Sequence, residues 1–356
     1  MDNKRLTSLI PAAALVLGTA LSGTVLAKGP ALKEGNEYMI VANYPNNMHV
    51  IDLQTDSLYK SCDLPDAFGP GVTQMAPDGK TAYILNNRYE DIYGINLDNC
   101  DITFHAKMSL QKNERTKSIF SFALSPDGSE LYAVQNPTML NRDHYRVQPA
   151  RLAVYDTGSG LDAKPVRTFP SPRQVTVMQT GADGTLYMAG ADIYKVDVNT
   201  GEVGVAIPSR NWERPLYAPP DVLNAWPIQA PSKDFTILYT TAKFQDESYN
   251  LDAADWIYGF MNINLETGET ETTDFGPITE IYFSGVRSPK DPNLVFGVLN
   301  RLAKYDIEKK ELIAAAELDH SYYCVAINHD GSKIYLGGTF NDVAIYDADS
   351  MEKLGN

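Results

Sequence analysis

Positive charge is scarce in this sequence and is nowhere concentrated. Lysine and arginine together number 30 among 356 residues, against 45 aspartates and glutamates, which gives a formal net charge of −15. No run of basic residues is longer than two. Because a protein binds nucleic acid or an anionic membrane through a basic patch that neutralises phosphates, we expect neither as a partner.

The motifs of the common catalytic and cofactor sites are missing as well. The sequence contains no GxSxG, HExxH or GxxxxGK[ST], and no GxGxxG that opens a helix. It has no CxxCH for attaching a c-type haem, and its five histidines are too scattered to indicate a zinc site. We therefore expect no catalytic residue, no metal ligand and no cofactor on this chain.

Only one long hydrophobic run is present, and it lies at the N-terminus. Lys4 and Arg5 precede an apolar stretch over 9–21, and Val25 and Ala27 place small residues at the −3 and −1 positions of a cleavage site. This pattern predicts a signal peptide over 1–27 and a mature chain over 28–356 in an exported, oxidising compartment. The stretch is shorter than the roughly 20 residues that span a bilayer, so an uncleaved anchor is the less favoured alternative.

Cysteine is rare, with three copies in the chain. Cys62 and Cys100 occupy similar settings, SCDLP and NCDIT, about one structural repeat apart, whereas Cys324 lies in the apolar run YYCVAI. We expect a disulfide between Cys62 and Cys100 and a buried free thiol at Cys324.

A repeated pair of strands around an Asp-Gly turn dominates the rest of the sequence. The segments APDGKTAYIL, SPDGSELYAV, GADGTLYMAG and NHDGSKIYLG each place this turn ahead of a short strand that contains tyrosine. Their spacing fits a unit of about 49 residues, and the strand that follows each hairpin recurs seven times. The sequence therefore predicts an all-β chain, a single seven-bladed β-propeller domain with four antiparallel strands per blade.

The two ends of the repeat do not match. The first blade starts with its second strand, in the segment YMIVANY, and has no inner strand before it. The sequence stops at Asn356, where the outer strand of the seventh blade begins. We expect the C-terminus to be truncated before the strand that closes the ring, because closure removes an unprotected sheet edge. An open ring is the alternative.

The two faces of such a propeller would differ. The Asp-Gly turns and the turns after the third strands fall on one face and are short. The other face carries the loops between second and third strands and the crossings between blades, and we call it the loop-rich face. Its longest segments are 136–149, 210–231 and 244–255.

Aromatic residues recur where the inner strands begin, beside the central channel. They are Phe68, Phe120, Trp226, Tyr282, Phe283, Tyr322 and Tyr323. Because neighbouring residues of a strand point to opposite sides, about half of them should pack between blades. The others would form a partner-docking surface or line a substrate pocket, with Trp226 and Tyr323 as the main anchors.

Several stretches are distinctive beyond the propeller periodicity. They are GNEYMIVANYPNNMHVIDLQTDSLYKSCDLPDAFGPG, KTAYILNNRYEDIYGINLDNC, RNWERPLYAPPDVL and LYTTAKF. With them, essentially the whole mature chain resembles the β subunit of bacterial quinohemoprotein amine dehydrogenase. The resemblance implies a propeller of the YVTN type in a periplasmic heterotrimer that oxidises primary amines to aldehydes and ammonia.

In that family the redox groups belong to other chains. Cysteine tryptophylquinone lies on a small cross-linked γ subunit, and two c-type haems lie on the α subunit. The resemblance implies that this chain holds the γ subunit, helps to enclose the substrate pocket and is not catalytic by itself. The family closes its ring with C-terminal residues that have no counterpart in this sequence.

A function of a different class is compatible with the same fold. A self-standing propeller hydrolase of the lactonase kind, or a periplasmic binding module, would share the architecture. A hydrolase would need His, Asp, Glu or metal ligands that converge on the channel, whereas the segments that enter it carry mainly aromatics, prolines and glycines. We therefore favour the non-catalytic subunit.

Overall fold

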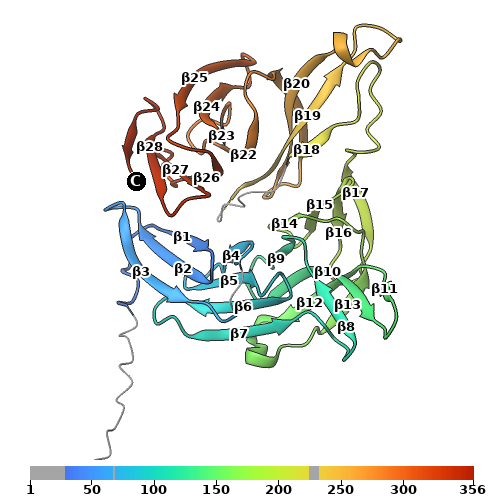
Figure 1. Cartoon of the computed structure of the whole chain (residues 1–356), viewed down its shortest axis with the longest axis vertical. Coiled ribbons are helices and arrows are strands. Elements are labelled where there is room, and N and C mark those ends of the chain that lie inside the picture. The colour runs from blue at the N-terminus through green and yellow to red at the C-terminus, as the bar shows by residue number, and fades with distance from the viewer. Residues whose placement is uncertain (1–28, 67–68, 224–231) are drawn as a thin grey trace, which may run out of the picture.

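Seven antiparallel sheets arranged in a ring make up the chain (Figure 1). The structure is a computed structural model and describes residues 29–66, 69–223 and 232–356. Blades 2 to 7 each contain an ordered set of four antiparallel strands, and blade 1 contains three. The seven-bladed β-propeller predicted from the sequence is confirmed.

Each blade runs from an inner strand beside the channel to an outer strand at the rim. Blade 1 consists of β1 (Tyr38–Asn43), β2 (Asn47–Asp52) and β3 (Ser57–Asp63), and blade 2 of β4 (Thr73–Met75), β5 (Thr81–Asn86), β6 (Asp91–Asn96) and β7 (Ile102–Lys107). Blade 3 consists of β9 (Phe122–Leu124), β10 (Glu130–Leu140), β12 (Arg151–Asp156) and β13 (Arg167–Pro170), with β8 (Glu114–Lys117) and β11 (Tyr145–Val147) paired to the far end of β10.

The other four blades follow the same order. Blade 4 consists of β14 (Val177–Thr180), β15 (Leu186–Ala189), β16 (Ile193–Val196) and β17 (Val203–Ile207), and blade 5 of β18 (Asp221–Leu223), β19 (Asp234–Lys243), β20 (Asp255–Asn264) and β21 (Thr270–Pro277). Blade 6 consists of β22 (Tyr282–Arg287), β23 (Leu294–Leu299), β24 (Arg301–Asp306) and β25 (Glu311–Glu317), and blade 7 of β26 (Tyr322–Ile327), β27 (Lys333–Gly338), β28 (Val343–Asp347) and β29 (Lys353–Gly355). The described residues include two short 3-10 helices, η1 (Thr157–Asp162) and η2 (Leu251–Ala253), and neither could cross a membrane.

The Asp-Gly turns form where the sequence places them. In each turn the aspartate accepts a hydrogen bond from the backbone N–H two residues later, and the glycine between them has φ between +67° and +86°. Residues with a Cβ rarely adopt this conformation, which explains the glycine. The four turns are those of Asp78, Asp127, Asp183 and Asp330.

The apolar core lies between blades rather than within them. Among the described residues, seven clusters of buried side chains each join two neighbouring blades. Between blades 2 and 3, for example, Phe104 packs with Phe122 and Tyr155. The cluster between blades 7 and 1 has the fewest buried members, Leu53, Tyr335 and Ile345. The first and last blades are therefore in contact, through a smaller apolar core than the other pairs.

Polar contacts add to the junction of blades 7 and 1. Asp56, in the turn between β2 and β3, accepts hydrogen bonds from the Lys333 ammonium and from the Tyr335 hydroxyl, the latter at 2.9 Å. The backbone N–H of His329 donates to the Glu37 carboxylate at 2.8 Å. No described strand lies inside β1, whose six residues are all partly exposed.

A disulfide joins Cys62 of β3 to Cys100, which precedes β7, with a Cα–Cα distance of 5.4 Å. The pairing expected from the sequence is confirmed, and it links the rims of blades 1 and 2. Cys324 is a free thiol in β26, and burial raises its pKa to about 11. A thiol of this kind is slow to react in the folded protein, because the thiolate is the reactive form.

Replacing both Cys62 and Cys100 with alanine should lower the free energy of unfolding by about 3 to 4 kcal/mol, because the bridge closes a loop between cysteines 38 residues apart. Urea unfolding of the oxidised wild type and of the variant measures this difference. Thiol labelling of the denatured, non-reduced wild type should modify Cys324 alone. Labelling of all three cysteines would contradict the bridge.

Asp56→Ala should destabilise the junction of blades 7 and 1 by about 2 kcal/mol, because it removes the acceptor of the Lys333 and Tyr335 hydrogen bonds. Asp56 has φ +50°, and asparagine tolerates that conformation better than alanine does. Asp56→Asn should therefore cost less, about 1 kcal/mol. Equal stability of the wild type and both variants in urea would show that Asp56 does not couple these blades.

Candidate functional site at the channel mouth

The structure separates the predicted channel aromatics into buried and accessible residues. Tyr282 and Tyr322 are 3% and 0% exposed and belong to the cores between blades. Phe283 and Tyr323, one residue further along β22 and β26, are accessible, and Phe283 is 38% exposed. The alternation expected for these strands is therefore observed. Phe68 and Trp226 lie outside the described residues.

Phe283 and Tyr323 form an aromatic pair across two neighbouring inner strands. Their ring centroids are 4.8 Å apart and the rings are nearly perpendicular, at 87°. The Ser284 hydroxyl donates a 2.8 Å hydrogen bond to the Tyr323 carbonyl, which holds the two strands together. The pair is consequently rigid and partly open to solvent, as the anchor residues of protein interfaces are.

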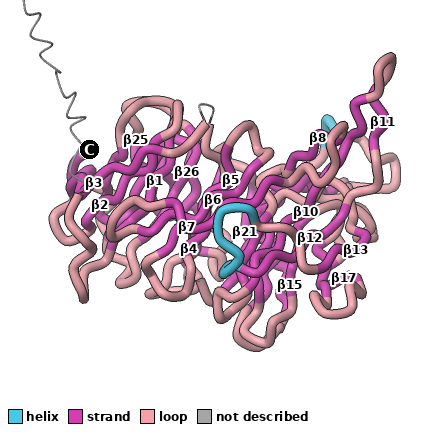
Figure 2. Tube along the Cα trace, turned by 90° about the horizontal axis from the view of Figure 1, so that it is seen from below, coloured by secondary structure: helices cyan, strands magenta, loops and turns pink. Residues whose placement is uncertain are grey.

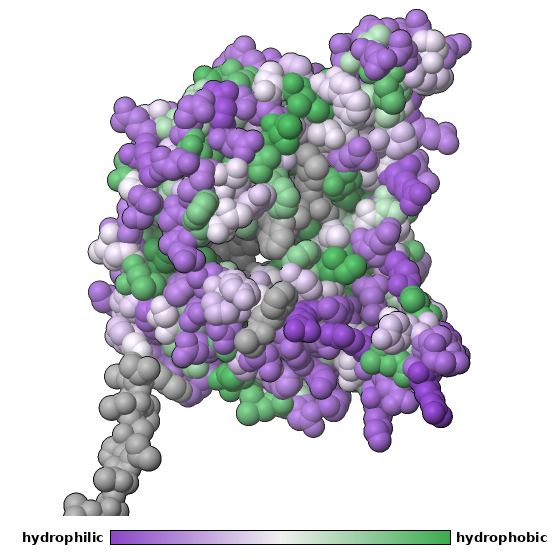
Figure 3. Space-filling view, viewed as in Figure 1, coloured by the Kyte–Doolittle hydropathy of each residue, from purple (hydrophilic) through white to green (hydrophobic). Residues whose placement is uncertain are grey.

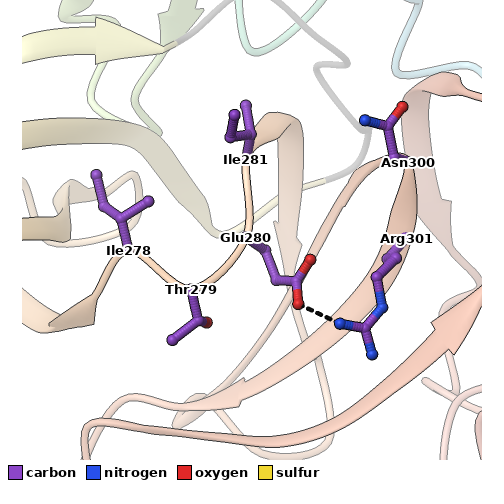
Figure 4. Close-up of a pocket in the computed structure, with 6 residues that line it drawn as sticks. All are labelled: Ile278, Thr279, Glu280, Ile281, Asn300 and Arg301. Carbon is purple, nitrogen blue, oxygen red and sulfur yellow. Dashed lines mark hydrogen bonds and ion pairs between the residues drawn. The ribbon is translucent and has the colours of Figure 1, made fainter.

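A pocket of about 370 Å³ adjoins this pair along the chain (Figure 4). The crossing from β21 to β22 forms one wall, and the turn between β23 and β24 forms the other. Glu280 accepts a 2.5 Å hydrogen bond from Arg301, which is also 2.9 Å from Glu317. Ile281 is 70% exposed and points away from the ion pair, as Figure 4 shows. The lining residues are Ile278, Thr279, Glu280, Ile281, Asn300 and Arg301.

His320 and Asp342 lie at the edge of this pocket. The Ser321 hydroxyl connects the two regions, because it hydrogen bonds to the Asn300 side-chain oxygen at 2.6 Å. The Nε2 atom of His320 is 3.1 Å from each Asp342 carboxylate oxygen, and its Nδ1 atom is 3.1 Å from the Ser321 carbonyl oxygen. The buried Tyr322 donates a 2.6 Å hydrogen bond to the same carboxylate.

Both ring nitrogens of His320 therefore face acceptors, which favours the doubly protonated imidazolium. Burial alone would lower the pKa of His320, but the hydrogen bonds to the Ser321 carbonyl and to Asp342 outweigh it, and the pKa is raised above 6.5. Burial alone would raise the pKa of Asp342, but the hydrogen bonds from Tyr322 and His320 hold it below its usual range. In its doubly protonated form the His320 ring has no free lone pair with which to accept a proton or bind a metal ion.

Asp342 belongs to a pattern that the sequence analysis missed. In five blades a charged residue at, or just before, the start of the third strand fixes a neighbouring segment on the loop-rich face. Asp91 contacts His105, Arg151 contacts Glu114, Asp192 accepts from Ser209, Arg301 contacts Glu280, and Asp342 contacts His320. The signal is visible in the sequence, in the third-strand segments DIYGIN, RLAVYD, DIYKVD, RLAKYD and DVAIYD.

The opposite part of the channel mouth contains Phe120, which is partly buried. Its ring centroid lies 4.9 Å from that of Tyr89, in the turn between β5 and β6. Asn87, Arg88 and Tyr89 have φ of +51°, +56° and +68°, a conformation that is uncommon for residues other than glycine. A Cβ on Gly71 would lie 2.9 Å from the Tyr89 ring, so glycine permits this close approach.

The channel mouth combines apolar side chains with fixed charges. Figure 3 shows apolar residues beside the central opening of a mostly hydrophilic face. Within residues 29–66, 69–223 and 232–356, no three histidine, cysteine, aspartate or glutamate side chains are grouped as a metal site would require. The arrangement suits the docking of another protein, with Phe283 and Tyr323 as anchors and Glu280 and Arg301 as polar contacts.

Comparison with known proteins identifies the fold class and no family. No protein-family model matches the sequence, and a search of curated proteins finds no relative. Among solved structures, hydrazine synthase of Kuenenia stuttgartiensis is similar with a TM-score of 0.60 and 14% identity, over 95% of this chain and 100% of that chain. Dihydro-heme d1 dehydrogenase NirN has a TM-score of 0.51 and 14% identity, over 92% and 74% of the two chains.

The Pan2 WD40 domain of Neurospora crassa is also similar. Its TM-score is 0.56 and its identity is 11%, over 92% of each chain. At these identities the likeness establishes the β-propeller fold and leaves the function open.

His320→Gln should change how stability depends on pH. Because the folded pKa of His320 is raised, its contribution to stability is fully present below its unfolded pKa of about 6.5 and is lost as pH rises through the folded value. The wild type should therefore be more stable than the variant, and the difference in their free energies of unfolding should be largest at acidic pH. Urea unfolding from slightly acidic to alkaline pH measures this difference. Asp342→Asn should also abolish the pH-dependent stability that His320 contributes, because it removes the carboxylate that His320 contacts. Parallel profiles of the wild type and His320→Gln would contradict the imidazolium assignment.

Proposed function

We propose that this chain is the non-catalytic propeller subunit of a periplasmic amine dehydrogenase of the quinohemoprotein type. In this assembly a small γ subunit carries cysteine tryptophylquinone, and an α subunit carries two c-type haems. The propeller holds the γ subunit and helps to enclose the pocket in which a primary amine is oxidised to an aldehyde and ammonia. The proposal starts from the distinctive sequence stretches of the mature chain that resemble this family.

The observation that carries the proposal is the accessible aromatic pair of Phe283 and Tyr323 at the channel mouth. Ile281 and Phe340, which are 70% and 64% exposed, extend the same apolar surface toward the pocket and His320. Exposed aromatic and aliphatic side chains around a charged pocket are typical of a surface that another protein covers. Two of the similar solved structures are, by name, a hydrazine synthase and a dehydrogenase, in keeping with a propeller in a redox enzyme.

The alternative of a self-standing hydrolase receives less support from the geometry. Hydrolysis by a general base requires a side chain that can accept a proton at the site. His320 is the histidine nearest the pocket, and both of its nitrogens already face acceptors. Glu280 is paired with Arg301, and this ion pair makes its carboxylate a poor general base. We therefore assign these groups to the shape and charge of a docking surface.

Phe283→Ala and Tyr323→Ala should each weaken binding of the partner subunits by roughly 30-fold, because truncating a buried anchor costs about 2 kcal/mol. The chain is coexpressed with the proposed partners, a CxxCH protein as the α subunit and a small cysteine-rich polypeptide as the γ subunit, and the complex is quantified by haem absorbance. Asp183→Ala, in an Asp-Gly turn of the opposite face, is the matched control and should leave binding unchanged. Weaker binding by the control alone would contradict the proposal and would place the docking surface on the face of the Asp-Gly turns.

Two further measurements separate docking from packing and from catalysis. The melting temperatures of the isolated Phe283→Ala and Tyr323→Ala chains should stay close to that of the wild type. The isolated wild-type chain should show no dye-linked amine oxidation and no visible haem or quinone band. Amine turnover by this chain, with contamination by partners excluded, would refute the non-catalytic assignment.

A further inference from the structure

Blade 4 lies between two projecting segments. Its second and third strands are joined by a turn of residues 190–192, whereas blades 3 and 5 on either side extend far beyond their sheets at the same position. We define the blade-3 arm as residues 112–117 and 136–150, and the blade-5 arm as residues 244–255. Figure 1 shows the strands at the base of both arms on the same side of the ring as blade 4, and Figure 2 shows β8 and β11 projecting from the body.

The blade-3 arm is basic and is held rigidly at its base. Its positive residues are Lys112, Arg115, Lys117, Arg142 and Arg146. Of its two carboxylates, Glu114 is buried and pairs with Arg151 at 2.5 Å, and Asp143 contacts the adjacent His144. The Glu114 pair fixes β8 against β12. The tip exposes apolar surface as well, since Tyr145 and Val147 are 77% and 64% exposed.

The blade-5 arm carries the opposite charge. Its charged residues are Asp246, Glu247, Asp252 and Asp255, and it contains no lysine or arginine. A hydrogen bond from Gln245 to Asp255 and ring contact between Phe244 and Tyr249 order the arm. Tyr249 and Leu251 are each 56% exposed. One molecule therefore presents a basic arm and an acidic arm on the two sides of blade 4.

Between the arms lies the outer strand of blade 4, β17, with the sequence VGVAI. Among the outer strands that the structure describes, β17 is the one without a charged residue, since β3, β7, β13, β21, β25 and β29 each carry at least one. Val203 and Val205 are 39% and 50% exposed. Charged residues normally protect an edge strand from pairing with another chain, and β17 lacks that protection.

From these features we infer that two copies of this chain associate through blade 4, about a two-fold axis that passes near Val205. Identical strands related by a two-fold axis perpendicular to them run antiparallel, so β17 pairs with β17 of the second copy and Val203 lies opposite Ile207. The same rotation brings the basic blade-3 arm of each copy to the acidic blade-5 arm of the other. Because the axis is two-fold, the association stops at a dimer. The contact is distinct from the channel mouth, so this inference does not rest on the proposed function.

The first test is the mass of the purified full chain by sedimentation equilibrium at micromolar concentration. We expect twice the monomer mass. Val205→Lys places two positive charges near the axis and should weaken association at least about ten-fold. Ile313→Lys, on the 43% exposed isoleucine of the blade-6 outer strand β25, is the matched control and should leave association unchanged. A monomeric wild type, or loss of association in the control alone, would overturn the inference.

The second test exchanges the charges of the arms. Arg142→Glu with Arg146→Glu gives the blade-3 arm a net negative charge, so both arms of that variant are acidic. Asp246→Lys, Glu247→Lys and Asp252→Lys together give the blade-5 arm a net positive charge, so both arms of the other variant are basic. Each variant alone should be monomeric, and an equimolar mixture should form a one-to-one heterodimer, because every contact between arms then joins opposite charges. Circular dichroism confirms that each variant is folded. Folded variants that stay monomeric when mixed, or that each dimerise as the wild type does, would exclude the crossed arms.

Discussion

The packing of each blade against the next is the interaction on which the rest of this molecule depends. Strand residues alternate between the two sides of a sheet, so every blade has two apolar faces that only its neighbours can cover. Phe104 between blades 2 and 3 and Phe296 between blades 6 and 7 illustrate the result, since each is 1% exposed. This constraint requires apolar residues on the faces of each sheet but sets no requirement for the loops that join the strands. A three-residue turn in blade 4 can therefore stand between two long arms of opposite charge without disturbing the core.

The parts of the structure that the sequence predicted are those set by local chemistry. The Asp78 turn depends on residues that are adjacent in sequence, and the alternation of Tyr282 and Phe283 follows from the geometry of a single strand. The Cys62–Cys100 bridge was expected from the similar local sequences of the two cysteines, although Cys62 lies near the end of β3 and Cys100 lies in the turn before β7. The contact of His320 with Asp342 was not expected, because one residue lies in a crossing and the other in a loop of the next blade. Residue spacing carries no information on how such segments meet.

The same limit applies to the function of individual side chains. A lone histidine in a sequence is equally compatible with a base, a ligand or a structural cation, and its hydrogen-bond partners decide between them. For His320 the partners are two acceptors, which favour a structural cation at the entrance of β26 over a base or a ligand. The accessible groups beside it are consequently apolar or already paired. That combination makes the channel mouth better suited to contact with a protein surface than to acid–base chemistry.

Two of the sheet edges, those of β1 and β17, differ in what surrounds them. The free edge of β1 faces the channel, at the place where each of the other six blades has a further inner strand. The free edge of β17 faces outward and can meet a folded molecule. Both edges offer the same backbone N–H and C=O groups, so backbone chemistry alone cannot select a partner for either. Selectivity must come from the side chains around each edge. At β1 these are the walls of the channel, and at β17 they are the charged arms of blades 3 and 5. The first arrangement favours a single strand and the second favours a surface with the complementary pattern of charge.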